Sequence, residues 1–223
     1  MKIRRSVVTF ILRMLINTFC KVDSKEYVQA LKKNKPMIIA FNHINFLEIL
    51  IFATQGYPLY VTGLAKIETW KNPLFAFIFN TYKAVPINRG GAFTESFKAA
   101  HERIDEGFFV CISPEGTRSK NGVLKKGKAG IIQLALETGT PILPVGHNGG
   151  ENIWKNIKRF RRTPCIYKAG LPFRLKFEGR PDKDERESMI TEVMCQIAKL
   201  LPEEMRGVYS DRVNSETKYL DFI

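Results

Sequence analysis

The sequence is short of cysteine, histidine and acidic side chains. It has four cysteines, three histidines and 22 acidic residues, against 35 lysines and arginines. The cysteines, Cys20, Cys111, Cys165 and Cys195, lie far apart and lack the spacing of a zinc site or a disulfide framework. This pattern predicts thiols in a reducing compartment, with Cys111 and Cys195 buried. It also predicts an activity that needs no metal ion and no cofactor.

The deficit of acids gives a formal net charge of +13 and an isoelectric point near 9.7. So strong a positive charge indicates an anionic partner, such as nucleic acid, anionic lipid headgroups or a phosphorylated substrate. The hydrophobic content of 44% is enough for a packed core, and 223 residues suit one sizeable α/β domain or two small ones. No internal repeat or interdomain linker divides the sequence.

A long hydrophobic run is also missing. The apolar N-terminal stretch has basic residues before it but no small-residue cleavage site of a signal peptide. A helix over 7–20 would be about 21 Å long, short of the roughly 30 Å hydrocarbon core of a bilayer. Ser6, Thr9, Arg13 and Asn17 form one polar stripe at helical spacing, and the rest of the circumference is apolar.

Segment 1–22 is therefore predicted to be an amphipathic helix that lies in a membrane interface with its arginines at the headgroups. The alternative is a helix packed on the domain itself.

Short apolar runs that end in turn signals alternate with helical patterns along the rest of the sequence. Such runs are typical of buried strands, and their alternation with helices indicates an α/β fold. We expect one α/β domain over 23–205, with a mostly parallel or mixed sheet flanked by helices, and a polar, extended C-terminal tail over 206–223. The predicted strands are 37–41, 59–62, 84–87, 108–112, 141–146 and 172–177, with helices within 23–36 and at 49–53, 73–82, 93–104, 128–138 and 184–200.

The first candidate for chemistry lies where the strand 37–41 ends in Asn42-His43. Glu48 follows five positions after His43, about one helical turn further on. An imidazole beside a carboxylate is the minimal general-base pair, because the acid fixes the tautomer and the ring accepts a proton. Taken alone, such a pair can equally be a satisfied surface contact.

Two other polar loops also follow predicted strands. Arg89 precedes two glycines and would suit a phosphate, while segment 113–119, SPEGTRS, places Glu115, Thr117 and Arg118 in one tight turn. Loops at the same edge of a sheet converge if their strands are neighbours. We therefore expect these loops to meet His43.

Two further features lie near these loops in the sequence. Segment 122–129, GVLKKGKA, resembles a phosphate-binding Walker loop, but Ala129 stands where a hydroxyl is required. Its cations, Lys125, Lys126 and Lys128, are better interpreted as a basic approach to the site. His147 has no acid beside it in sequence, which favours a structural or substrate-lining role over a second catalytic histidine.

Two segments leave alternatives open. The aromatic segment 70–82 is either a buried helix or a surface that touches acyl chains or a bilayer. The segment 154–162, WKNIKRFRR, has five cations and two aromatics, and could bind anionic lipid or a nucleic-acid backbone or be a solvated loop. Nucleic acid is disfavoured because the aromatics elsewhere lie in apolar runs and no recognised binding motif is present.

The order of these motifs carries a resemblance. Asn-His with an acid five positions on, an Arg-Gly turn, PEGTR and an Ile-Leu-Pro-Val strand resemble the glycerophospholipid acyltransferase family over roughly 37–201. The bacterial 1-acyl-sn-glycerol-3-phosphate acyltransferases belong to that family. The PEGTR block together with the His-acid pair is the specific part.

The resemblance implies roles for individual residues. His43 matches the general base, and Glu48 matches the acid that orients it, which is usually Asp. The extra methylene moves the carboxylate by roughly 1 Å, a distance to which catalysis is sensitive. The residues that match the family's substrate-binding positions are Lys66, Arg89, Glu115, Gly116, Thr117 and Arg118. Pro144 and Val145 match a block that is tied to acyl-donor binding or to packing.

The implied activity is acyl transfer from acyl-CoA or acyl-carrier protein to a lysophospholipid, foremost 1-acyl-glycerol-3-phosphate, at an anionic membrane on the cytoplasmic face. His43 would take the hydroxyl proton directly, without an acyl-enzyme, while Lys66, Arg89 and Arg118 hold the phosphate. The alternatives are a catalytically weak lipid-binding relative and an acyltransferase for another lysophospholipid.

Overall fold

The computed structural model describes residues 2–88, 94–119 and 121–223. The strands are β1 (Cys20–Asp23), β2 (Ile38–Phe41), β3 (Val61–Lys66), β4 (Val85–Ile87), β5 (Phe109–Ile112), β6 (Ile142–Asn148), β7 (Thr163–Ala169), β8 (Phe173–Leu175) and β9 (Leu220–Phe222). The α-helices are α1 (Lys2–Phe19), α2 (Lys25–Lys33), α3 (Glu48–Gln55), α4 (Pro73–Thr81), α5 (Thr94–Asp105), α6 (Gly130–Thr138), α7 (Ile153–Ile157) and α8 (Lys183–Lys199).

The strands form one mixed sheet in the order β1-β7-β6-β2-β5-β3-β4, and β8 and β9 extend it from β6. Every pair from β6 through β4 on this path is parallel, whereas β7 and β8 pair antiparallel with β6. The carboxyl ends of β2, β3, β4, β5 and β6 therefore lie at one edge of the sheet. The predicted α/β fold with a mixed sheet is confirmed.

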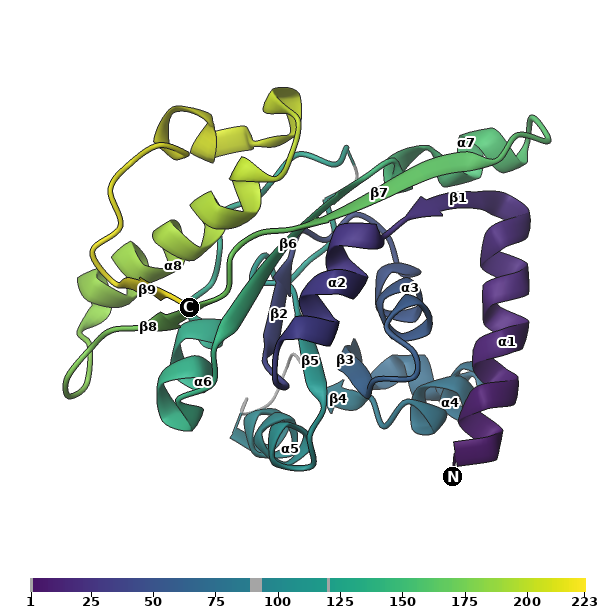
Figure 1. The fold of residues 1–223 in the computed structure, drawn as a ribbon, viewed down its shortest axis with the longest axis horizontal. Coiled ribbons are helices and arrows are strands. Elements are labelled where there is room, and N and C mark those ends of the chain that lie inside the picture. Colours follow the sequence, from purple (N-terminus) through teal and green to yellow (C-terminus); the bar gives the residue numbers. More distant parts are fainter. Residues whose placement is uncertain (1, 89–93, 120) are drawn as a thin grey trace.

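Helices cover both faces of the sheet (Figure 1). Strand β2 is buried on both sides, and alternate residues enter different cores: Ile38 and Ala40 pack toward α6 and α8, while Ile39 and Phe41 pack toward α2 and α3. This period of two follows from the pleat of a strand. A continuous apolar run is what a two-sided buried strand requires.

The C-terminal segment after α8 is ordered against the domain. It forms a short 3-10 helix over Gly207–Arg212 and then β9, which pairs antiparallel with β8. Tyr209, Val213 and Leu220 are buried in the same core as α8. The expectation of an extended tail over 206–223 is wrong, because apolar residues spaced through a polar segment still close one end of the core.

Helix α1 packs along α3 and α4, and several of its polar side chains bond to the domain. Thr9 Oγ1 lies 2.8 Å from Tyr82 Oη, and Ser6 Oγ lies 2.5 Å from Tyr57 Oη. Arg13 Nε donates to the Thr54 carbonyl at 2.8 Å. Three of the four stripe residues, Ser6, Thr9 and Arg13, thus contact the domain, whereas Asn17 is exposed.

The predicted arginine contacts with headgroups are therefore wrong for Arg5 and Arg13. Arg5 is 5% exposed, donates to the Leu59 carbonyl at 2.6 Å and lies over the Tyr60 ring at 4.5 Å. Burial lowers the pKa of its guanidinium. Carbonyls and tyrosine rings at the end of α3 replace water for these cations, which a sequence pattern cannot reveal.

The outward face of α1 is apolar. Its large exposed side chains are Ile3, Val7, Phe10, Ile11, Met14 and Leu15, each at least half exposed. They recur at helical spacing and form a strip that no described part of the chain covers. None of the helices within the described residues combines the length and the apolarity that crossing a bilayer demands.

Candidate active site

The site is built at the carboxyl edge of the sheet, where β2 ends. His43 follows β2, and its ring Nδ1 is in hydrogen-bond contact with Glu48 Oε2, the first residue of α3. The other carboxylate oxygen, Oε1, accepts the backbone N–H groups of Ile44 and Asn45 at 2.6 and 2.5 Å. The loop therefore wraps around a carboxylate that is 1% exposed.

This geometry sets the tautomer of His43. A carboxylate accepts hydrogen bonds, so Nδ1 bears the proton and Nε2 keeps its lone pair. The His43 side chain is 18% exposed, whereas Glu48 is buried. The pair therefore presents one basic nitrogen toward solvent, which is the arrangement that a general base requires.

Glu115 ties the PEGTR turn to the histidine. Its Oε1 accepts the His43 backbone N–H at 2.7 Å, and its Oε2 accepts the Lys125 N–H at 3.0 Å. The Ser119 N–H in turn donates to the His43 carbonyl at 2.6 Å. Both backbone groups of His43 are thus fixed by the loop that follows β5.

The substrate contact expected of Glu115 is not its role in this structure. The side chain is 2% exposed and both oxygens are engaged by amides, so it has no oxygen to offer a ligand. Burial raises the pKa of its carboxyl group. Glu115 is a structural link between two loops, and a negative charge would repel a phosphate in any case.

Gly116 has φ of +67°, a conformation in which L side chains are strained. A Cβ there would also lie 3.3 Å from Lys128 Cδ. The turn therefore brings Thr117 and Arg118 to the surface beside His43. Lys125 Nζ braces this turn by donating to the Arg118 carbonyl at 2.6 Å.

A groove of about 880 Å³ opens next to His43. Its polar lining includes two exposed cations from different strand ends, Lys66 at the end of β3 and Arg118 after β5, together with one acid, Glu68. Its apolar wall comprises Ile44, Phe46, Ile49, Leu64, Ala65, Phe75, Phe79 and Ile87. A base, two cations and an apolar wall in one groove suit an amphiphile with an anionic headgroup.

The structure places the remaining predicted residues as follows. Thr117 lines the groove, whereas Pro144 and Val145 lie on β6 beside Ala40 and Phe41 and pack within the sheet. Of the two roles expected for Pro144 and Val145, packing is the one observed. Arg89 lies outside the described residues. The cysteines Cys20, Cys111, Cys165 and Cys195 are buried free thiols.

Asn42, whose role the sequence analysis did not predict, joins β2 to His147 of β6 beneath the site. The Asn42 side chain donates to the His147 carbonyl at 2.8 Å and accepts the His147 N–H at 2.9 Å. The amide thus imitates a peptide group and extends the sheet by one residue pair. An asparagine directly before the histidine was the available signal, but its partner is 105 positions away.

His147 is 1% exposed and does not line the groove. Its Nε2 lies 2.5 Å from the Asn42 carbonyl oxygen and 3.4 Å from Glu48 Oε1. Because a carbonyl only accepts, Nε2 bears the proton. Burial lowers the pKa of this ring. The predicted structural role fits this position, and the nearby acid that the sequence did not show is Glu48 itself.

The segment 70–82 resolves into a half-buried helix. Ile78 and Phe79 of α4 are buried, while Leu74 and Phe77 are 64% and 48% exposed. Phe75 and Phe79 also line the groove. One face of α4 is therefore buried as the first alternative predicted, and contact of the exposed face with acyl chains or a bilayer stays a prediction.

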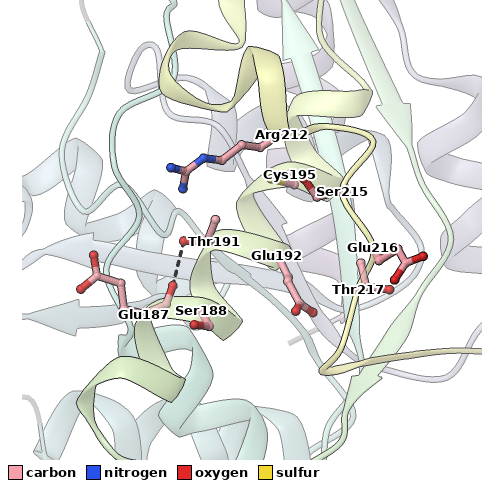
Figure 2. A pocket seen from close by; sticks show the side chains of 9 residues that line it. All are labelled: Glu187, Ser188, Thr191, Glu192, Cys195, Arg212, Ser215, Glu216 and Thr217. Atoms are coloured by element: carbon pink, nitrogen blue, oxygen red, sulfur yellow. Dashed lines mark hydrogen bonds between the residues drawn. The ribbon is translucent and has the colours of Figure 1, made fainter.

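A second cavity of about 450 Å³ lies away from His43, between α8 and the C-terminal segment. Figure 2 shows the Arg212 guanidinium extended beside Thr191, with the carboxylates of Glu187, Glu192 and Glu216 around the opening. Thr191 Oγ1 donates to the Glu187 carbonyl at 2.8 Å. With no imidazole and no apolar wall, this cavity lacks the arrangement described for the groove.

Comparison with known proteins matches residues 20–148 to the family model described as acyltransferase. A 1-acyl-sn-glycerol-3-phosphate acyltransferase of Borreliella burgdorferi is 31% identical, over 76% of this chain and 67% of its own. The enzyme of that name from Cocos nucifera is 31% identical, over 63% of this chain and 47% of its own. An N-acylphosphatidylethanolamine synthase of Arabidopsis thaliana is 31% identical, over 62% and 53%.

The chain spans about half the length of these last two relatives. Among solved structures, the 1-acyl-sn-glycerophosphate acyltransferase PlsC from Thermotoga maritima superposes with a TM-score of 0.61. That match covers 85% of this chain and 76% of the other, at 23% identity. At this identity, the likeness supports the fold alone.

Proposed function

Because the chain belongs to the acyltransferase family, we propose that it transfers a fatty acyl group from an acyl thioester to the free hydroxyl of 1-acyl-sn-glycerol-3-phosphate, giving phosphatidate. The family membership confirms the resemblance that the motifs indicated. The observation that carries the proposal is the His43–Glu48 pair at a groove lined by two cations and by apolar side chains.

The chemistry follows from the free nitrogen of His43. Nε2 accepts the proton of the acceptor hydroxyl as its oxygen attacks the thioester carbonyl carbon, and the carbon–sulfur bond then breaks. The proton can leave with the thiol, so the ring returns to its starting state without an acyl-enzyme. Glu48 stabilises the imidazolium that forms between these two steps.

Substrate positioning follows from the groove. Lys66 and Arg118, on separate strand ends, would hold the acceptor phosphate at a set distance from His43. Holding the reacting groups in place can supply ~7 kcal/mol or more of the barrier reduction. The aromatic and aliphatic wall would take an acyl chain. Acyl-CoA and acyl-carrier protein are both suitable donors, and both are anionic, like the phosphate.

We further propose that the protein works at the cytoplasmic face of a membrane with α1 in the interface. The support is the apolar outward face of α1, whose inward polar side chains are satisfied by the domain. A helix buries apolar residues when it can, so an exposed strip of six large ones calls for an apolar medium. Free thiols fit a reducing compartment.

The test is acyl transfer by the purified protein from acyl-CoA and from acyl-carrier protein to lysophosphatidate, followed as phosphatidate. His43→Ala should lower the rate by about 10²–10⁴-fold, the usual contribution of a general base. His101→Ala is the matched control, because His101 is an exposed histidine on α5. If the wild type transfers an acyl group to another lysophospholipid but not to lysophosphatidate, the acceptor must be reassigned. If it transfers to no lysophospholipid, the proposed enzymatic activity is contradicted.

A further inference from the structure

The segment 153–162, which contains α7 and the turn into β7, is rich in cations. We call it the cationic loop. It has no acidic residue, and its five cations are all exposed: Lys155, Lys158, Arg159, Arg161 and Arg162. No step of the proposed reaction uses them. A concentration of one sign of charge on an exposed loop suits an anionic partner.

Two aromatic side chains project from the same loop. Phe160, at the turn, is completely exposed and has φ of +52°, while Trp154 is 57% exposed. Exposure of a phenylalanine ring to water is unfavourable in free energy, and a purely polar partner would not bury the ring. The loop therefore offers an apolar tip within a ring of positive charge.

The cationic loop lies at the same end of the molecule as the apolar face of α1. Arg162 Nη2 donates to the carbonyl of Cys20, directly after α1, at 2.9 Å, and β1 pairs with β7. In Figure 1, α1 and the loop beyond α7 project on the side away from α8 and the C-terminal segment. Phe160 and the outward residues of α1 can thus meet one surface.

The loop also reaches the mouth of the groove. Trp154 stacks on Phe46 with ring centroids 6.2 Å apart and an interplanar angle of 19°. Phe46 lines the groove and meets Phe75 of α4 edge to face. The cationic loop, the groove mouth and α4 are therefore connected through contacting aromatic rings.

We propose that the cationic loop is a second membrane contact, which binds anionic phospholipid headgroups through its cations and inserts Phe160 among the acyl chains. The inference rests on the proposed membrane association of α1 and adds a partner of stated charge. Two contacts on one side fix the tilt of the protein, so that the groove faces the bilayer. An acidic protein would pair with the cations but leave Phe160 and the strip of α1 uncovered.

The experiment is co-sedimentation of the full chain with vesicles of phosphatidylcholine alone and with phosphatidylglycerol added. Arg159→Gln combined with Arg161→Gln should weaken binding to the anionic vesicles at least tenfold, because each cation near such a surface contributes about fivefold. Binding to neutral vesicles should change little. Phe160→Ala should weaken binding to both kinds of vesicle.

The matched control is Arg180→Gln combined with Lys183→Gln, two exposed cations at the start of α8. Equal losses in both double variants would show a general charge effect and overturn the proposal. Unchanged vesicle binding by the Arg159 and Arg161 double variant would also overturn the proposal. If that variant instead showed slower acyl transfer from acyl-carrier protein but not from acyl-CoA, the loop would be assigned to binding that acidic protein. Vesicle binding needs no turnover. If the wild type proves inactive but the variants still lose vesicle binding as predicted, only the proposed reaction is contradicted.

Discussion

The loop that bears His43 and the helix α1 both turn polar side chains inward, but they leave opposite groups at the surface. In the loop, Glu48 and Glu115 accept the backbone amides around them, and the His43 ring stays partly open with a basic nitrogen. In α1, Thr9 and Arg13 bond to the domain, and what remains open is a strip of large apolar residues.

The difference indicates what each surface can bind. A rigidly held base that faces a groove suits a reactant that gives up a proton, because the groups around the base are already hydrogen-bonded. An apolar strip outside a hydrogen-bonded polar face suits an apolar medium. If this comparison is right, changes in the loop should affect turnover or folding, and changes on the outside of α1 should affect membrane binding alone.

The largest expected effect comes from removing the charge of Glu48 while keeping its length. Glu48→Gln should lower kcat/KM by about 10²–10³-fold, because the amide can neither fix the tautomer of His43 nor stabilise its cation. Steady-state phosphatidate formation measures this. Glu137→Gln, an exposed glutamate on α6, should behave as wild type. Near normal activity of Glu48→Gln would contradict the inference that the loop holds a catalytic base.

The next effect separates the two faces of α1. Phe10→Ser with Met14→Ser, on the outside, should weaken vesicle binding by about 30-fold or more with an unchanged free energy of unfolding. Val8→Ser with Leu12→Ser, on the buried face, should instead destabilise the fold. Co-sedimentation and urea unfolding distinguish the two outcomes. If the Phe10 and Met14 double variant binds vesicles as well as wild type does, α1 does not contact the membrane.

A smaller effect tests the link beneath the site. Asn42→Ala leaves the N–H and the carbonyl of His147 unpaired in the core, and should lower the free energy of unfolding by about 2 kcal/mol. Asn214→Ala, at an exposed position, is the control. Urea denaturation compares them. Equal stability of the two variants would mean that the sheet edge does not depend on this amide.

The smallest effect is a pH dependence from His147. Burial lowers its pKa, so the folded chain keeps the ring neutral while the unfolded chain takes up a proton near pH 6.5. The contribution of His147 to the free energy of unfolding is therefore fully present above about pH 6.5 and is lost as the pH falls below that value. Between pH 7.5 and 5.5 the wild type should lose about 1 kcal/mol more than His147→Gln, measured by denaturant unfolding. Parallel losses would exclude His147 as the titrating group.

Local patterns in the sequence were enough to predict the α/β fold and the position of the base. Apolar runs that end in turn signals predicted β2, β3, β4, β5, β6 and β8, and His43 with Glu48 stood at the end of β2. These features depend on neighbours a few positions apart, which a sequence displays directly. The amphipathic pattern of α1 was also visible, since helical spacing alone reveals a polar stripe. The prediction missed β1, β7 and β9, which lie in segments with many polar side chains.

Only the tertiary structure decided which way these features face. Arg5 and Arg13 of α1 turned inward because carbonyls and tyrosines of α3 and its following loop were there to receive them. Glu115 became a link between loops because two amides from distant segments enclose it. Asn42 and His147, 105 positions apart, meet because β2 and β6 are neighbours. Each outcome depends on partners far along the chain, and strand order alone brings them together.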